Sequence, residues 1–116
     1  MATVLIYHNP RCSKSRLTLQ LLHENNIDPK IIEYLKTPPS PSELAIISAK
    51  LEKTPMEFIR NKEAEFKMLN LDKFDGTNEE LFKLMSDNPK LIERPIVVNG
   101  DHAAIGRPPE SVLQLF

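Results

Sequence analysis

Three helix-start signals follow one another in the middle of this chain and constrain its fold more than any other feature. Each begins with Ser or Thr and has Glu three residues later: Ser-Pro-Ser-Glu at residues 40–43, Thr-Pro-Met-Glu at 54–57 and Thr-Asn-Glu-Glu at 77–80. This capping-box pattern is typical of helix N-termini, and proline suits the first helical position. The sequence predicts successive helices over a stretch of about 50 residues, too long for a simple crossover.

The chain before this stretch has the pattern of a strand, a helix and a second strand. Residues 3–7 form an almost continuous apolar run that favours a buried strand. A helical pattern covers residues 12–25, and residues 30–35 read as the next strand. Such a unit places both strands in one parallel sheet. The apolar face predicted for the helix consists of Leu17, Leu21 and Leu22.

The C-terminal part returns to strands. Residues 95–98 and 101–105 flank Asn99 and Gly100, and Asn-Gly is a strong signal for a two-residue hairpin turn. A short helix follows from residue 106. The fold class predicted is α/β, a thioredoxin-like mixed sheet with the order β-α-β, helical insertion, β-β-α. We expect a single domain over residues 1–116, with the insertion at about residues 40–90.

The single cysteine, Cys12, lies between the first strand and the first helix. A helix N-terminus, nearby cations and partial exposure at a turn all favour a thiolate, which is the reactive form. We expect positive charge from Arg11, Lys14 and Arg16, and hydrogen bonds to sulfur from Ser13 and Ser15. His8, at the end of the first strand, can line the same turn or serve only as a hydrogen-bonded turn residue. With one cysteine in the chain, a redox cycle through Cys12 needs an external thiol.

Three arginines lie near predicted element boundaries. Arg60 falls late in the helix that follows residues 54–57, Arg94 directly precedes Pro95, and Arg107 lies between the hairpin and the last helix. Guanidinium groups match the geometry of tetrahedral oxyanions, so converging arginines would bind one well. In a thioredoxin-type fold, the proline that opens the third strand is usually cis and faces the active cysteine, which makes Arg94 the most suggestive of the three.

Composition limits the partners. The formal charge of −1 argues against nucleic acid or an anionic membrane as the main partner, and no run approaches the length of a membrane span. One cysteine fits a reducing cytoplasm. The first seven residues lack the features of a secretion signal, so we expect them to belong to the folded domain. The scattered histidines and the lone cysteine predict no metal site, and His23 and His102 read as surface residues.

Four segments together resemble the glutaredoxin-dependent arsenate reductase family, and the resemblance runs along essentially the whole chain. They are His-Asn-Pro-Arg-Cys-Ser-Lys-Ser-Arg at residues 8–16, Tyr-Leu-Lys-Thr-Pro-Pro at 34–39, Glu-Arg-Pro-Ile-Val-Val at 93–98 and Gly-Arg-Pro at 106–108. The resemblance implies that Cys12 attacks arsenate as a thiolate, helped by His8 and Ser15. It also implies that three arginines bind the oxyanion: Arg60, Arg94 and Arg107. Glutathione as co-substrate and glutaredoxin as partner then complete the reduction to arsenite.

Two other functions fit the same residues. A glutathione-linked thiol oxidoreductase acting on another anion or on a disulfide would need the same thiolate. The related Spx regulators bind RNA polymerase without being enzymes and often use a Cys-x-x-Cys switch. This chain has Ser15 where the second cysteine of that switch would lie, which argues against a disulfide switch.

Overall fold

The structure is a computed structural model that describes residues 3–116. Its contacts divide the chain into two compact units, which are described one at a time. One unit consists of the residues up to Thr37 together with Arg94–Phe116. The other consists of Pro38–Glu93. Residues 1 and 2 of the expected folded start lie outside the described residues.

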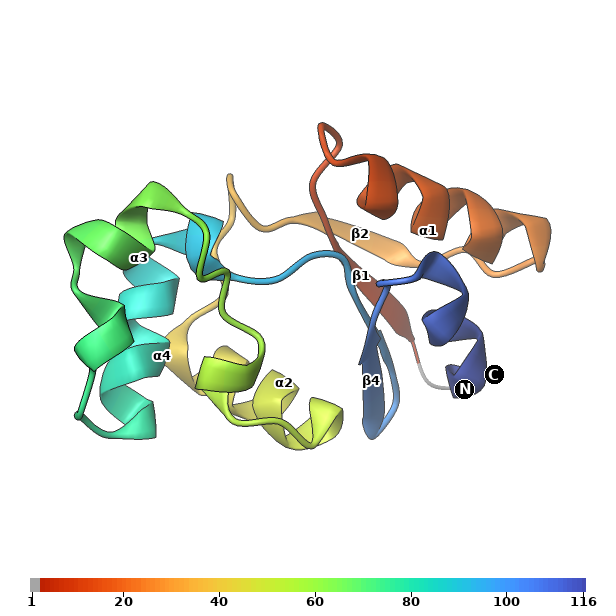
Figure 1. The fold of residues 1–116 in the computed structure, drawn as a ribbon. Coiled ribbons are helices and arrows are strands. Elements are labelled where there is room, and N and C mark those ends of the chain that lie inside the picture. Colours follow the sequence, from red (N-terminus) through yellow and green to blue (C-terminus); the bar gives the residue numbers. More distant parts are fainter. Residues whose placement is uncertain (1–2) are drawn as a thin grey trace. The chain divides into compact units, whose positions relative to one another are not determined.

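The first unit contains a four-stranded mixed sheet in the order β2-β1-β3-β4 (Figure 1). Strands β1 and β2 are parallel, whereas β1 with β3 and β3 with β4 are antiparallel. This arrangement confirms the predicted α/β class with a thioredoxin-like mixed sheet. The strands are β1 Val4–His8, β2 Lys30–Glu33, β3 Ile96–Asn99 and β4 His102–Ile105, and the helices are α1 Ser13–Glu24 and the 3-10 helix η4 Pro109–Leu115.

Helix α1 packs against η4 beside the sheet, over a core formed by Ile6, Leu22, Val97 and Val112. The apolar face predicted for α1 is only partly right. Leu22 is buried, but Leu17 is 50% exposed, and the other buried positions of the helix are Ser15 and Thr18. Thr18 packs directly against Gly106, and Ser15 hydrogen-bonds to His8, so both positions suit small polar side chains.

Gly106 shows how close that packing is. A Cβ atom at this position would lie 2.5 Å from Thr18 Oγ1 and 2.7 Å from Pro95 Cγ. The Gly106 N–H also donates to the Pro95 carbonyl at 2.9 Å. The Arg94–Pro95 peptide bond is cis, as predicted, and the Arg107–Pro108 bond is cis as well. The close approach at Gly106 therefore places the segment that carries Arg107 beside the segment that carries Arg94.

The hairpin turn lies one residue later than predicted. Asn99 pairs with His102 at the end of the ladder, so the two loop residues are Gly100 and Asp101. Gly100 has a φ of 62°, a left-handed conformation that glycine adopts without strain. Asn99 instead uses its side-chain amide to donate to the Leu115 carbonyl at 2.6 Å.

The second unit is helical, and two of its three predicted start signals behave as expected. Ser40 and Glu43 form a capping box at the start of one helix, and Thr77 and Glu80 form another. The two longest helices of this unit, α2 and α4, pack against each other. Its elements are α2 Pro41–Leu51, η1 Pro55–Glu57, α3 Ala64–Met68, η2 Leu71–Lys73, α4 Asn78–Asp87 and η3 Pro89–Leu91.

The helix predicted after residue 54 is wrong. The start signal gives only the 3-10 turn η1, after which Ile59 forms an antiparallel bridge with Ile92. The Arg60 N–H donates to the Leu91 carbonyl at 2.7 Å, and the Glu93 N–H donates to the Phe58 carbonyl at 3.0 Å. These long-range hydrogen bonds replace helical ones, so Arg60 lies in an extended segment rather than late in a helix.

None of the helices within residues 3–116 combines the length and the apolar character that a membrane span requires.

Candidate active site

Cys12 is the N-cap residue of α1 and closes a tight turn after β1. Its N–H donates to the Asn9 carbonyl at 3.0 Å, and its own carbonyl accepts from the Arg16 N–H at 3.0 Å. Its φ and ψ of −96° and 123° are extended, as expected where a helix begins. The residue is only 8% exposed, which is less than the sequence predicted.

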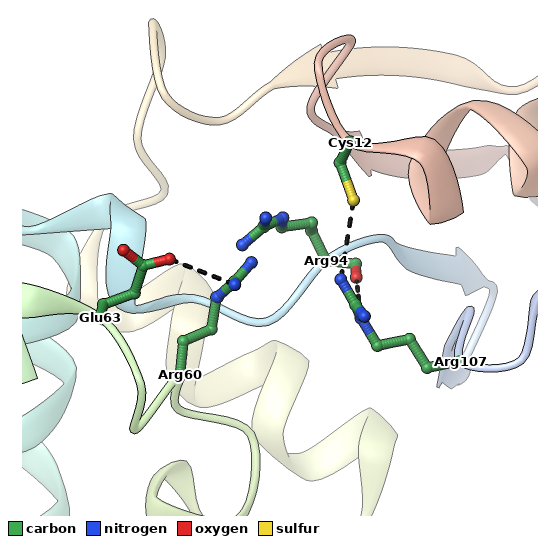
Figure 2. Close-up of polar contacts among 5 residues, drawn as sticks. All are labelled: Cys12, Arg60, Glu63, Arg94 and Arg107. Atoms are coloured by element: carbon green, nitrogen blue, oxygen red, sulfur yellow. Dashed lines mark hydrogen bonds and ion pairs between the residues drawn. The ribbon is translucent and has the colours of Figure 1, made fainter.

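Two of the three predicted arginines belong to the same unit as Cys12 and approach its thiol (Figure 2). Arg107 donates from Nη2 to Cys12 Sγ at 3.6 Å and from Nε to the Arg94 carbonyl at 2.8 Å. Arg94 also donates a side-chain hydrogen bond to the sulfur. Figure 2 shows the sulfur pointing toward these two residues. The structure therefore brings Cys12, Arg94 and Arg107 together.

The surroundings of the thiol favour its ionised form. Burial raises the pKa of Cys12. A larger opposite effect comes from the Ser15 N–H, the hydrogen bond and charge of Arg94, and the Lys14 N–H, which together lower the pKa by more than burial raises it. The net result is a pKa below the ordinary value of a cysteine. The N–H groups of Ser15 and Lys14 belong to the first turn of α1, where backbone donors have no partner within the helix.

The other predicted cations act away from the sulfur. Arg16 donates from Nη1 to the Pro10 carbonyl at 2.9 Å and so braces the turn. The side chains of Arg11 and Lys14 are exposed to solvent. Arg94 and the backbone thus provide the pKa lowering that the sequence analysis assigned to these three side chains.

His8 and Ser15 form a buried pair beneath the turn. Their Nδ1 and Oγ atoms are 2.6 Å apart, and Ser15 Oγ also accepts from the Asn9 N–H at 3.1 Å. Burial holds the pKa of His8 below its usual 6.5, and the nearby Arg16 lowers it further against an opposing effect of Glu33. The Ser15 hydroxyl was expected to bond the sulfur but bonds His8 instead. His8 is therefore hydrogen-bonded to the first turn of α1.

Arg60 belongs to the helical unit. Its Nη2 pairs with Glu63 Oε1 at 3.2 Å, as Figure 2 shows, and its Nη1 is buried without a hydrogen-bond partner among residues 3–116. Its backbone N–H is held by the Leu91 carbonyl.

Two residues that shape the site were missed at the sequence level. Asn9 accepts the Cys12 N–H with its carbonyl and the Arg11 N–H with Oδ1, at 3.0 Å each. An asparagine directly before proline after a strand is a turn signal that could have indicated this role. Gly106 has no such local signal, because its need for a missing side chain arises from Thr18 and Pro95.

Within residues 3–116 no three His, Cys, Asp or Glu side chains gather closely enough to hold a metal ion. His23 and His102 are exposed, as predicted.

The chain is similar to known proteins along nearly its whole length. An arsenate reductase of Haemophilus influenzae is 51% identical over 115 residues, covering 98% of this chain and 99% of that protein. The uncharacterized protein YfgD of Escherichia coli is 50% identical over 113 residues, covering 97% of this chain and 95% of that protein. The solved structure of an arsenate reductase from Vibrio cholerae matches with a TM-score of 0.95 at 46% identity, covering 99% of this chain and 98% of that one.

A family model also matches the chain, and its match covers the candidate site. It matches residues 7–115 under the description "ArsC family", a span that includes Cys12 and all three arginines considered above. With agreement in sequence over nearly the full length and in fold, the chain belongs to the ArsC family.

Proposed function

We propose that this protein reduces arsenate to arsenite, with Cys12 as the nucleophile. The observation that carries the proposal is a thiol of lowered pKa at a helix start, with two guanidinium groups directed at its sulfur. A thiolate is the attacking species, and fixed cations offset the charge of an oxyanion and of its transition state. The names of the relatives from Haemophilus influenzae and Vibrio cholerae support arsenate as that oxyanion.

The reaction begins with two substitutions at arsenic(V). The Cys12 thiolate forms an S–As bond while one As–O bond breaks, and the oxygen leaves as water after protonation. The thiol of glutathione then displaces a second oxygen as water. Arsenic stays in its higher oxidation state through both steps, because each exchanges one oxygen ligand for one sulfur ligand.

Reduction occurs when a glutaredoxin thiolate attacks the glutathione sulfur. The new S–S bond oxidises the two sulfur atoms, and the electron pair of the broken S–As bond remains on arsenic, which becomes arsenic(III). Water then cleaves the bond between Cys12 and arsenic, releasing arsenite and the free thiol. The chain has one cysteine, so these additional thiols come from glutathione and glutaredoxin. Glutathione as reductant and an unpaired cysteine both fit a cytoplasmic location.

We assign the remaining residues by their contacts. Arg94 and Arg107 hold the oxyanion and the arsenic adduct beside the sulfur. Arg60 is assigned as a third oxyanion ligand on the family resemblance alone. His8 and Ser15 are positioning residues. They hold the turn through Asn9, so that the N–H groups of the first helical turn face the thiolate.

The experiment that tests this function follows arsenate-dependent NADPH oxidation with glutathione, glutaredoxin and glutathione reductase. Wild type should turn over, and Cys12→Ser should lose all activity above the background without enzyme. Turnover retained by Cys12→Ser would overturn the mechanism. If the folded, reduced wild type gives no turnover, the alternative is a glutathione-linked thiol oxidoreductase with another substrate. A panel of other oxyanions and of mixed disulfides with glutathione tests that alternative.

A further inference from the structure

A cavity opens at the turn that leads into Cys12. It has a volume of about 180 Å³ and is lined by residues 8–11 together with Glu33, Leu35 and Lys36. We call it the turn pocket. Its walls are the ends of the parallel strands β1 and β2 and the turn that leads into the cysteine.

The turn pocket carries a net positive charge. Arg11 and Lys36 supply two cations and Glu33 supplies one carboxylate, which lies 3.5 Å from Lys36 Nζ. The Arg11 backbone is fixed by its N–H bond to Asn9 Oδ1 at 3.0 Å. Lys36 is held near the pocket because its N–H donates to the Glu33 carbonyl at 2.9 Å. A carboxylate entering the pocket would meet two cations whose backbones are already positioned.

The turn pocket is also next to the thiol along the chain. Arg11 directly precedes Cys12, and the hydrogen bond from the Cys12 N–H to the Asn9 carbonyl makes them part of one turn. A carboxylate bound there would lie beside Arg11, the residue before Cys12, and the arginines that contact the sulfur do not line the pocket.

The larger groove of the same unit is less suitable for an anion. It has a volume of about 460 Å³ and runs between α1 and the start of η4. Its charged lining residues are Lys14, Glu24 and Glu110, so its net charge is negative, and Leu17, Leu21, Pro108 and Pro109 make much of it apolar. Of these two cavities, the turn pocket is the one that complements a carboxylate.

We propose that the turn pocket binds a carboxylate end of glutathione and so delivers its thiol to the arsenic on Cys12. The inference rests on the proposed function for its chemistry. Glutathione is a tripeptide with a carboxylate at each end and its thiol on the middle residue. Because an extended chain spans about 3.3–3.6 Å per residue, anchoring the carboxylate of the glycine end places the thiol about one residue away. That reach matches the position of Cys12, next to Arg11 in the pocket wall.

The first test measures binding without turnover. S-methylglutathione, which cannot react, is titrated into the reduced wild-type protein while backbone amide shifts are followed by NMR. Shift changes should gather at residues 9–11 and 33–36. Changes confined to the groove between α1 and η4, or no changes up to tens of millimolar, would overturn the proposal. This readout needs no arsenate, so it is independent of the proposed function.

The second test separates the two co-substrates by kinetics. Lys36→Ala should raise the KM for glutathione by about 3- to 10-fold, and Lys36→Glu should raise it further, with the KM for arsenate unchanged. Lys30→Ala is the matched control, since Lys30 is an exposed lysine at the start of β2 and does not line the pocket. An unchanged KM for glutathione in both Lys36 variants, with normal arsenate turnover, would show that the turn pocket does not bind glutathione and would leave the proposed function intact.

Discussion

The helix starts of the two units differ in what satisfies their first backbone N–H groups. In α2, Ser40 Oγ accepts from the Glu43 N–H at 3.2 Å, and Glu43 returns a bond to the Ser40 N–H. Helix α4 repeats this arrangement with Thr77 and Glu80. In α1, the N-cap is Cys12. Among the described residues, this helix start has no side-chain capping hydrogen bond and no acidic residue in its first turn.

This difference separates helix starts whose donors are capped by their own side chains from one whose donors act on a thiol. A capping box satisfies the donors of the first turn with the helix's own side chains. At α1, the N–H groups of Lys14 and Ser15 lower the pKa of the thiol instead. The same class of backbone donor therefore stabilises a helix in one unit and a thiolate in the other.

The largest effect is expected from Arg94→Ala. Removing this guanidinium removes a hydrogen bond and a positive charge from the thiolate, so the pKa of Cys12 should rise. Loss of one donor that acts on developing charge costs about 100-fold or more in kcat. The pH dependence of iodoacetamide alkylation measures the pKa, and the coupled NADPH assay measures kcat. Arg94→Lys keeps the charge, so its thiol pKa should stay closer to wild type while turnover still falls. An unchanged alkylation profile in Arg94→Ala would mean that the helix start alone sets the pKa.

A smaller effect, confined to stability, is expected from Thr77→Ala. The change removes the N-cap of α4 and should lower the free energy of unfolding by about 1 kcal/mol, measured by urea denaturation. The alkylation profile of Cys12 should not move. Thr77→Ser, which keeps the hydroxyl, is the control, and a shifted thiol pKa in Thr77→Ala would break the distinction between the two kinds of helix start.

Ser13→Glu converts α1 toward the capped type. A carboxylate in the first turn should stabilise the helix by about 0.3–1 kcal/mol and raise the pKa of the neighbouring thiol. Stability and thiolate formation should thus change in opposite directions. Ser13→Gln controls for side-chain size, and a lowered thiol pKa in Ser13→Glu would contradict the argument.

The smallest effect is a pH dependence centred on His8. Burial lowers the pKa of His8, so the unfolded chain takes up a proton first as the pH falls. The contribution of His8 to the free energy of unfolding is complete above pH 6.5, the ordinary pKa of histidine. It is lost as the pH falls from 6.5 through the lowered pKa of the folded state. Urea denaturation from pH 7.5 to pH 5 measures this loss. It should be smaller in His8→Asn, and an equal loss in both proteins would show that other groups cause it.

The sequence could predict features that depend on neighbours in the chain. The capping boxes at Ser40 and Thr77, the strand before Cys12 and the helix after it all depend on local patterns. The placement of Arg94 beside the thiol followed from the expected fold class, through the cis proline.

Features set by distant contacts could not be predicted. The segment around Arg60 is extended because of a bridge from Ile59 to Ile92, which overrides a good local start signal. Ser15 turns toward His8 because the end of β1 lies beneath α1. Gly106 is required because Thr18 and Pro95 meet there, and no pattern near residue 106 indicates that meeting.

The contact of Arg94 and Arg107 with Cys12 has a consequence for the protonation state of the substrate. Two guanidinium charges exceed the charge of one thiolate by one unit. A singly charged arsenate would bring this cluster to neutrality, whereas a doubly charged arsenate would leave it with an excess negative charge. Arg60, the third ligand proposed, adds no net charge because it pairs with Glu63 Oε1 at 3.2 Å. The cluster therefore matches the monoanion, whose share of total arsenate grows on acidification while the thiolate share declines. These opposing titrations imply a turnover optimum between the pKa of the bound thiol and that of the free oxyanion.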